Sequence, residues 1–161
     1  MKIFIDSNIF IEYFKDNPEA VKLFESVFRI TDVKLYINEI VYSEVTYVFI
    51  KTVSGKSYYE LKKNKRLVVQ HGSNFLNIFL PIFKYVKFLM INEDIIRLAN
   101  EYIIKYGLLP NDALILATCK FYEMEFLLSL DEDFQEPCKK EKFSLISNIR
   151  LLENLKGLQS W

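Results

Sequence analysis

The stretch Ile3–Ile9 reads IFIDSNI and decides the fold, because a buried strand gives way to a helix inside it. Its apolar start predicts a short strand over Lys2–Ile5. Asp6 interrupts the apolar run, and Ser7 begins a helical pattern that continues to Phe14. A carboxylate at such a junction is typical of a helix cap or of a metal ligand, and this stretch alone favours the cap. Carboxylates at comparable junctions elsewhere would favour the ligand.

The rest of the chain repeats this alternation of short apolar runs and helical patterns. Further strands are predicted at 34–37, 85–88, 126–130 and 143–146, and helices at 18–28, 38–52, 57–70, 73–83, 92–106 and 110–122. Strands that alternate with helices predict an α/β fold, a three-layer sandwich with a central, mostly parallel sheet of about four to five strands flanked by helices. We expect a single domain over 1–161, with a helical excursion at about 54–90.

The composition excludes several classes of protein and of site. Hydrophobic residues make up 51% of the 161 residues, so disorder is not expected. Lysine plus arginine and aspartate plus glutamate balance at 21 each, which gives no global support for nucleic-acid binding but leaves a local basic patch open. Two cysteines and one histidine are too few for a disulfide framework or a Cys/His zinc site. Any metal would therefore be held by oxygen ligands, which favours Mg²⁺ or Mn²⁺.

The chain shows no sign of a membrane or secreted protein. The N-terminal residues lack the long apolar core of a signal peptide, because Asp6 interrupts it. The most apolar segment, 75–91, contains Pro81, Lys84 and Lys87 and does not reach the length of a charge-free membrane span. We expect a soluble cytoplasmic protein with reduced thiols and no membrane partner.

Glu44 is an acidic residue on an apolar helix face. In the helix predicted from 38, the apolar face is formed by Ile40, Val41, Val45 and Val48. Glu44 lies four residues from both Ile40 and Val48, so it falls on the same face. A buried glutamate is costly unless it is paired or bound to a metal. A salt bridge to a basic residue of another element is the alternative interpretation.

Two more carboxylates stand at ends of predicted elements. Asp112, in LLPNDALILAT, lies in the first turn of an apolar helix, for which Asn111 is a candidate N-cap. The helix dipole would favour an acid there without any further role. Asp131, in FLLSLDEDF, follows a strand as Asp6 does, with Asp133 as its rival. A polar exit from the strand is the simpler interpretation of Asp131.

Parallel-sheet topology predicts that these carboxylates meet. Ligands of such sheets bind beyond the carboxyl ends of the strands, where Asp6 and Asp131 would project. The helix of Asp112 should begin at the same edge, and Glu44 would join if its helix packs on that rim. A cluster of this kind needs a cation to offset its charge, and its oxygen ligands suit one or two hard divalent ions.

Four segments, IDSNIFIEYF, INEIVYSEVTYVF, LLPNDALILAT and LLSLDEDF, together resemble the PIN-domain nucleases in their order along the chain. The resemblance is strongest to the toxin ribonucleases of VapBC-type toxin–antitoxin pairs and covers most of the chain. It is weakest over about 54–85, which is longer than in compact members. The four acidic positions of the family correspond here to Asp6, Glu44, Asp112 and Asp131. Asn8 and Ser129 match polar positions that support the site, and Asp133 matches a frequent extra acid, either a ligand or a support.

The resemblance implies a Mg²⁺- or Mn²⁺-dependent endoribonuclease, the toxin of a toxin–antitoxin pair. Its carboxylates would hold the metal, and metal-activated water would cleave the RNA phosphodiester bond. It also implies a homodimer and an antitoxin partner. The apolar stretch 73–91 would either fold into the core or provide a surface for such partners.

An RNA substrate requires positive charge near the acidic site. One basic group is interleaved with tyrosines and consists of Lys51, Lys56, Lys62, Lys63, Lys65 and Arg66. A second group consists of Lys139, Lys140 and Lys142. Ordinary solvated faces would explain both groups equally well.

Other functions were weighed against the ribonuclease. A phosphatase of haloacid-dehalogenase type would need an aspartate where Asn8 stands, and dinucleotide binding would need a glycine-rich loop that this chain lacks. An RNA-processing or RNA-binding protein without a toxin role remains open, as does a binding module whose acidic cluster is structural.

Overall fold

Five parallel strands form one sheet in the order β3-β2-β1-β4-β5 in this computed structural model, which describes residues 1–158. The last three residues of the predicted domain, 159–161, lie outside the described residues. The strands are β1 Lys2–Ile5, β2 Lys34–Asn38, β3 Val86–Leu89, β4 Phe126–Leu128 and β5 Ser144–Ile146. The parallel α/β sheet predicted from the sequence is confirmed.

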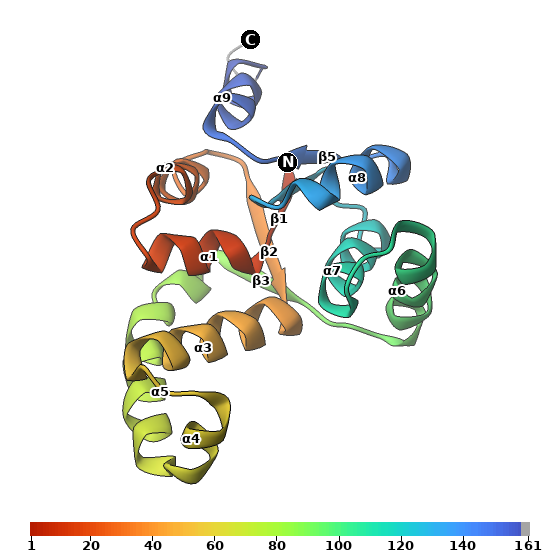
Figure 1. The fold of residues 1–161 in the computed structure, drawn as a ribbon. Coiled ribbons are helices and arrows are strands. Elements are labelled where there is room, and N and C mark those ends of the chain that lie inside the picture. Colours follow the sequence, from red (N-terminus) through yellow and green to blue (C-terminus); the bar gives the residue numbers. More distant parts are fainter. Residues whose placement is uncertain (159–161) are drawn as a thin grey trace.

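Helices cover the sheet on both sides, with α1 and α2 on one side and α6 and α7 on the other (Figure 1). The α-helices are α1 Ser7–Phe14, α2 Pro18–Val27, α3 Glu39–Ser54, α4 Tyr58–Lys63, α5 Lys65–Phe79, α6 Glu93–Tyr106, α7 Pro110–Phe121, α8 Gln135–Glu141 and α9 Ile149–Leu158. Two short 3₁₀ turns, η1 Ile82–Lys84 and η2 Glu132–Phe134, precede β3 and α8. Within residues 1–158, no helix is long and apolar enough to cross a membrane.

The central strand β1 sets the register of the sheet. Ile3, Phe4 and Ile5 are fully buried, as expected for a strand covered on both faces. Ile5 is paired with Leu128 of β4, so the two strands reach the same edge together. The residues after β1 and β4 are thereby brought side by side, although more than a hundred positions separate them in the chain.

The region between α3 and β3 differs from its prediction in where its helices break. One helix was expected over 57–70 and another over 73–83, but α4 ends at Lys63 and α5 runs without interruption past Gly72 to Phe79. The break occurs at Asn64, whose side chain accepts a hydrogen bond from the backbone N–H of Leu67 and so caps α5. A local capping bond thus outweighs the cost of a glycine inside the helix.

One face of α5 belongs to the main hydrophobic core. Phe75 and Phe79 are fully buried, and their rings stack with centroids 4.8 Å apart. Phe79 also packs against Phe10 of α1, with ring centroids 5.4 Å apart. Leu76, Ile78 and other apolar side chains beside this buried face are exposed. The segment 73–91 therefore both fills the core and presents an apolar surface.

Truncating the buried face of α5 should destabilise the whole domain. The change Phe79→Ala removes a fully buried ring and should lower the free energy of unfolding by about 3–5 kcal/mol in urea denaturation. Leu80→Ala, at a neighbouring side chain that is 53% exposed, is the control and should cost less than about 1 kcal/mol. Equal losses in the two variants would show that α5 is not part of the cooperative core.

Candidate active site

Asp6 has the role of helix cap that its sequence context favours. It is the N-cap of α1, and its Oδ1 accepts a hydrogen bond from the backbone N–H of Ser7 at 2.6 Å. Its own N–H donates to the carbonyl oxygen of Leu128 at 2.9 Å, which fastens it to the end of β4. The side chain is only 3% exposed, yet its second oxygen is not used by the cap. That oxygen is turned toward the polar groups that follow β4.

The hydroxyl of Ser129 connects the polar groups at this edge. It donates to Asp6 Oδ2 at 2.6 Å and accepts from Asn8 Nδ2 at 2.9 Å and from the backbone N–H of Asp131 at 3.0 Å. One donor and two lone pairs are all that a hydroxyl offers, so Ser129 is fully satisfied. Its buried side chain therefore fixes the carboxylate of Asp6 relative to the loop after β4.

Asn8 and the turn after Ser129 complete the connection between α1 and β4. Asn8 Oδ1 accepts from the backbone N–H of Leu130 at 3.1 Å, so both ends of its amide are used. Asp131 Oδ1 accepts from the backbone N–H of Asp133 at 2.9 Å. Asp131 thus caps η2 and has one carboxylate oxygen outside this bond. The two polar residues expected to support the site, Asn8 and Ser129, both lie in this network.

Glu44 accepts a hydrogen bond from Asn111, which the sequence indicated as a candidate helix cap. Asn111 was expected to cap α7, but the cap position is taken by Leu109, and Asn111 lies inside the first turn. Its Nδ2 donates to Glu44 Oε1 at 2.6 Å and joins α7 to α3. The prediction of a cap was wrong because Pro110 already opens the helix and leaves the amide free to turn outward. Its position beside Asp112 was the only sequence signal for this contact.

The helix face predicted to be apolar around Glu44 is only partly buried. Val41 and Val45 of the predicted apolar face are buried, whereas Ile40, Val48 and Glu44 itself are half-buried. The salt bridge predicted as an alternative for Glu44 is not found among residues 1–155, where its hydrogen-bond partner is the neutral amide of Asn111. Its negative charge therefore remains uncompensated.

Asp112 lies between the other carboxylates and is influenced by them. It is half-buried in the first turn of α7. Burial, together with the negative charges of Asp131, Glu44 and Asp133, raises its pKa to about 6. Direct contacts also place the four segments at the same edge of the sheet: Asn111 joins α7 to Glu44, and Ser129 joins Asp6 to the loop after β4. Asp112 and Asp131 line the same cleft.

Asp6 experiences the same environment from a more buried position. Burial is the main cause that raises its pKa, to about 7, and the charges of Asp112 and Glu44 act in the same direction. Hydrogen bonds from Ser129 and Ser7 oppose the shift but do not cancel it. Burial first, and then the neighbouring negative charges, therefore disfavour the ionised forms of Asp6 and Asp112.

The chemistry of these donors fits a hard divalent cation. Among residues 1–155, none of Asp6, Glu44, Asp112, Asp131 and Asp133 forms an ion pair with a basic side chain. All five offer carboxylate oxygens, the ligands that Mg²⁺ and Mn²⁺ prefer. In the same part of the chain, no three histidine, cysteine or acidic side chains are close enough to hold a metal as they stand. Bonds to Asn111 and Ser129 hold Glu44 and Asp6 in their present orientations.

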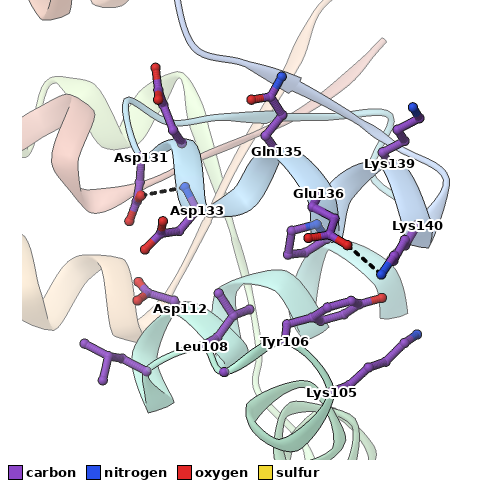
Figure 2. A pocket seen from close by; sticks show the side chains of 14 residues that line it. Lys105, Tyr106, Leu108, Asp112, Asp131, Asp133, Gln135, Glu136, Lys139 and Lys140 are labelled. Carbon is purple, nitrogen blue, oxygen red and sulfur yellow. Dashed lines mark hydrogen bonds and ion pairs between the residues drawn. The ribbon is translucent and has the colours of Figure 1, made fainter.

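A cleft opens beside the acidic residues and extends between α8 and the end of α6 (Figure 2). Its volume is about 820 Å³, within the range of ligand-binding pockets. Asp112, Asp131 and Asp133 lie at one end of it, and Lys105, Lys139 and Lys140 lie at the other. The sequence had indicated Lys139 and Lys140 as one of two basic groups, but not Lys105, which is close to them only in the folded chain.

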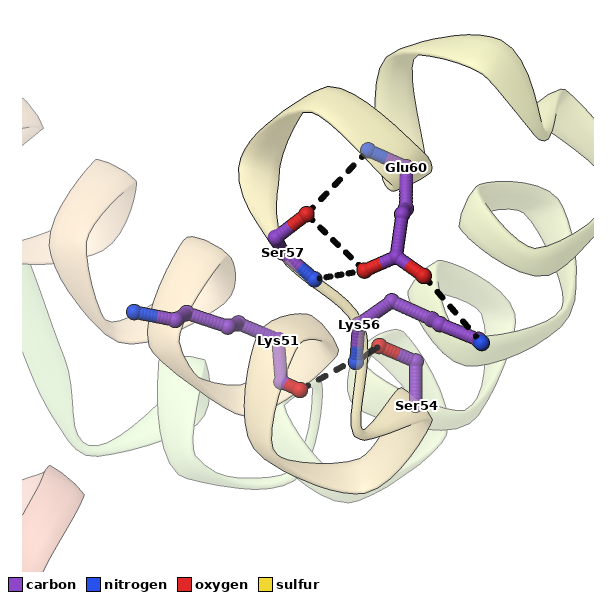
Figure 3. A network of polar contacts seen from close by, with 5 residues as sticks. All are labelled: Lys51, Ser54, Lys56, Ser57 and Glu60. Carbon is purple, nitrogen blue, oxygen red and sulfur yellow. Dashed lines mark hydrogen bonds and ion pairs between the residues drawn. The ribbon is translucent and has the colours of Figure 1, made fainter.

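The larger basic group lies on the helices of the excursion, outside the cleft. Lys51, Lys56, Lys62, Lys63, Lys65 and Arg66 are all exposed, and none of them lines the cleft. Lys56 is paired with Glu60 at 3.3 Å, and Glu60 closes a capping box with Ser57 (Figure 3). Hydrogen bonds from Ser57 and the charge of Lys56 lower the pKa of Glu60 to about 2. Part of this basic group thus serves the start of α4.

Comparison with known proteins gives consistent matches. The family model described as PIN domain matches residues 3–140. Ribonuclease VapC2 of Methanocaldococcus jannaschii is 40% identical over 134 residues, which cover 83% of this chain and 87% of that protein. The solved structure of VapC20 of Mycobacterium tuberculosis, described as a sarcin–ricin loop cleaving toxin, is 14% identical with a TM-score of 0.59. The match covers 84% of this chain and 94% of the VapC20 chain. VapBC2 of Rickettsia felis, solved bound to a promoter DNA fragment, is 18% identical with a TM-score of 0.58, over 91% and 98% of the two chains.

The raised pKa values predict that the metal-free protein loses stability as the pH rises. Between about pH 4 and pH 7 the folded state binds protons at Asp6 and Asp112 that the unfolded chain has released, so the slope of stability against pH is negative. Thermal denaturation in EDTA should give a lower Tm at pH 8 than at pH 5. In Asp6→Asn this difference should shrink, whereas in Glu101→Gln, at an exposed acid of α6 outside the site, it should persist. A wild-type Tm that does not fall over this interval would contradict the prediction.

Proposed function

Since this chain belongs to the PIN domain family, we propose that it is a divalent-metal-dependent endoribonuclease and the toxin of a toxin–antitoxin pair. The observation that supports the proposal is that acidic residues from four separate segments lie at the same edge of the sheet. None of them forms an ion pair with a basic side chain among residues 1–155. The relative at 40% identity is named a ribonuclease, which supports RNA as the substrate.

Asp6, Glu44, Asp112 and Asp131 would hold Mg²⁺ or Mn²⁺, with Asp133 as a further ligand or a support. When bound, such an ion supplies a water nucleophile of lowered pKa and neutralises charge on the phosphoryl oxygens. Ser129 and Asn8 orient Asp6 through the hydrogen bonds described above, and Asn111 orients Glu44. The chain's own contribution is thus to hold negative charge in place before the cation and substrate arrive.

Metal binding should be measurable without RNA. At pH 8, Mn²⁺ at a hundred times its dissociation constant should stabilise the folded protein by about 2.7 kcal/mol, seen as a rise in Tm. Asp112→Asn should abolish most of this rise, because it removes a central carboxylate. Glu132→Gln, which changes an exposed acid that also lines the cleft, should retain it.

The same variants test the reaction. With Mg²⁺, the wild type should cleave single-stranded RNA, and EDTA should abolish the cleavage. Asp112→Asn should reduce the rate by at least about a hundredfold, whereas Glu132→Gln should stay within a few fold of the wild type. Cleavage that continues in EDTA, or at an undiminished rate in Asp112→Asn, would refute the metal-dependent mechanism.

We also propose that the chain forms a homodimer and binds an antitoxin in the cytoplasm. Solved neighbours include toxin–antitoxin complexes, and the exposed apolar face of α5 offers a surface of the kind that partners cover. Both cysteines are free and buried, which agrees with a reducing compartment.

The exposed face of α5 can be tested for a role in dimer formation. Leu76→Lys with Leu80→Lys should shift the sedimentation of the purified protein from dimer to monomer, because charge would replace the apolar contact. Ile104→Lys, at an apolar residue of α6 that is even more exposed, should leave the dimer intact. A dimer that tolerates the α5 variant would place the interface elsewhere.

A further inference from the structure

The cleft beside the carboxylates is divided by charge along its length. Figure 2 shows Asp112, Asp131 and Asp133 together at one end and the lysines at the opposite end, with Tyr106 and Leu108 between them. Suppose that one phosphate of an anionic chain binds at the acidic end through a cation. The carboxylates at that end then repel every further phosphate of the chain. Its next favourable contact within the cleft is the group of lysines.

Lys105 lies near α8 because Glu141 of α8 binds the end of α6, through Lys105 at 2.9 Å and the hydroxyl of Tyr106 at 2.6 Å. Gly107 ends α6 with a φ of 68°, in the left-handed region that glycine adopts without strain. Lys105 lies on α6 and Lys140 on α8, and their Nζ atoms are 4.8 Å and 5.8 Å, respectively, from the centre of the Tyr106 ring. Lys139 also lines the cleft from α8. Two positive charges from two elements thus lie close to one ring, and a third lines the same cleft.

The lysines differ in how firmly each is paired within the protein. Lys105 is bonded at 2.9 Å to Glu141, whose side chain is only 10% exposed and also accepts from the hydroxyl of Tyr106. Lys140 is bonded at 2.6 Å to Glu136, which is 72% exposed. Solvent-exposed pairs contribute about 0–1 kcal/mol, so Lys140 can exchange Glu136 for another anion at little cost. Lys139 forms no ion pair with another residue of the described part of the chain.

We infer that the cleft is the binding path of single-stranded RNA, with Lys139 and Lys140 holding a backbone phosphate beyond the one that is cleaved. Lys105, fixed by Glu141, adds positive charge to this end without leaving its partner. This inference rests on the proposed ribonuclease function and assigns the substrate path for it. It favours the cleft over the basic group on α3, α4 and α5, because the latter lines no part of the cleft.

The first test measures binding in EDTA, where no metal-dependent cleavage occurs. The probe is a fluorescein-labelled single-stranded oligoribonucleotide of mixed sequence, and the readout is anisotropy at several salt concentrations. Lys139→Gln with Lys140→Gln should weaken binding by about tenfold and reduce the slope of log K against log salt by about 0.7–1.4. Lys62→Gln with Lys63→Gln removes the same charge from α4 and should leave affinity within about twofold.

A second variant should strengthen binding, which loss of structure cannot do. Glu136→Gln removes the exposed carboxylate that competes with phosphate for Lys140, so affinity for the same oligoribonucleotide should rise severalfold. The gain should disappear when Glu136→Gln is combined with Lys140→Gln. Circular dichroism of each variant confirms that the fold is retained.

The outcomes separate this inference from the proposed function. Cleavage of RNA by the wild type with Mg²⁺ tests the proposed function. The binding path is tested by comparing the RNA affinity of the cleft variant, Lys139→Gln with Lys140→Gln, with that of the α4 variant, Lys62→Gln with Lys63→Gln. Equal affinities in all variants, a loss confined to the α4 variant, or no binding by the wild type at low salt would overturn the path. Cleavage could still occur in any of those cases, and the ribonuclease proposal would then stand without it.

Discussion

The parallel pairing of β1 with β4 is the interaction on which the arrangement of the site depends. The backbone N–H of Asp6 donates to the carbonyl of Leu128, so the first residue after β1 is fastened to the last residue of β4. Ser129, one position further on, can then reach the carboxylate of Asp6 with its hydroxyl. A shift of one residue in this register would turn Ser129 to the other face of the sheet and remove the contact.

This geometry concentrates negative charge at a cost to the folded protein. Asp6 is buried without a basic partner in the described part of the chain, and Asp112 is repelled by three neighbouring carboxylates. Proteins retain such unfavourable clusters mainly at functional sites, where a ligand relieves the repulsion. Hydrogen bonds from neutral groups, rather than ion pairs, keep the carboxylates in position, and a cation can then bind without displacing a fixed positive charge.

Positive charge is distributed unevenly around the molecule, and its position matters more than its amount. The larger basic group lies on α3, α4 and α5, where part of it stabilises the start of α4. The smaller group, joined by Lys105, lies in the same cleft as the carboxylates. Electrostatic contacts weaken with distance and with screening by salt, so lysines that share a cleft with the site act on its substrate most directly.

The sequence by itself determined the parallel sheet, its alternation with helices as far as α7 and the positions of the acidic residues at the ends of elements. Local signals were sufficient there, because apolar periodicity, proline and glycine positions act within a few residues of one another. The sequence did not predict α8 or α9. Tertiary structure alone decided that Asn111 binds Glu44 instead of capping α7, and that Lys105 joins Lys139 and Lys140. These contacts connect segments that lie far apart in the chain, and only the packing of α3, α6, α7 and α8 around the sheet brings them together.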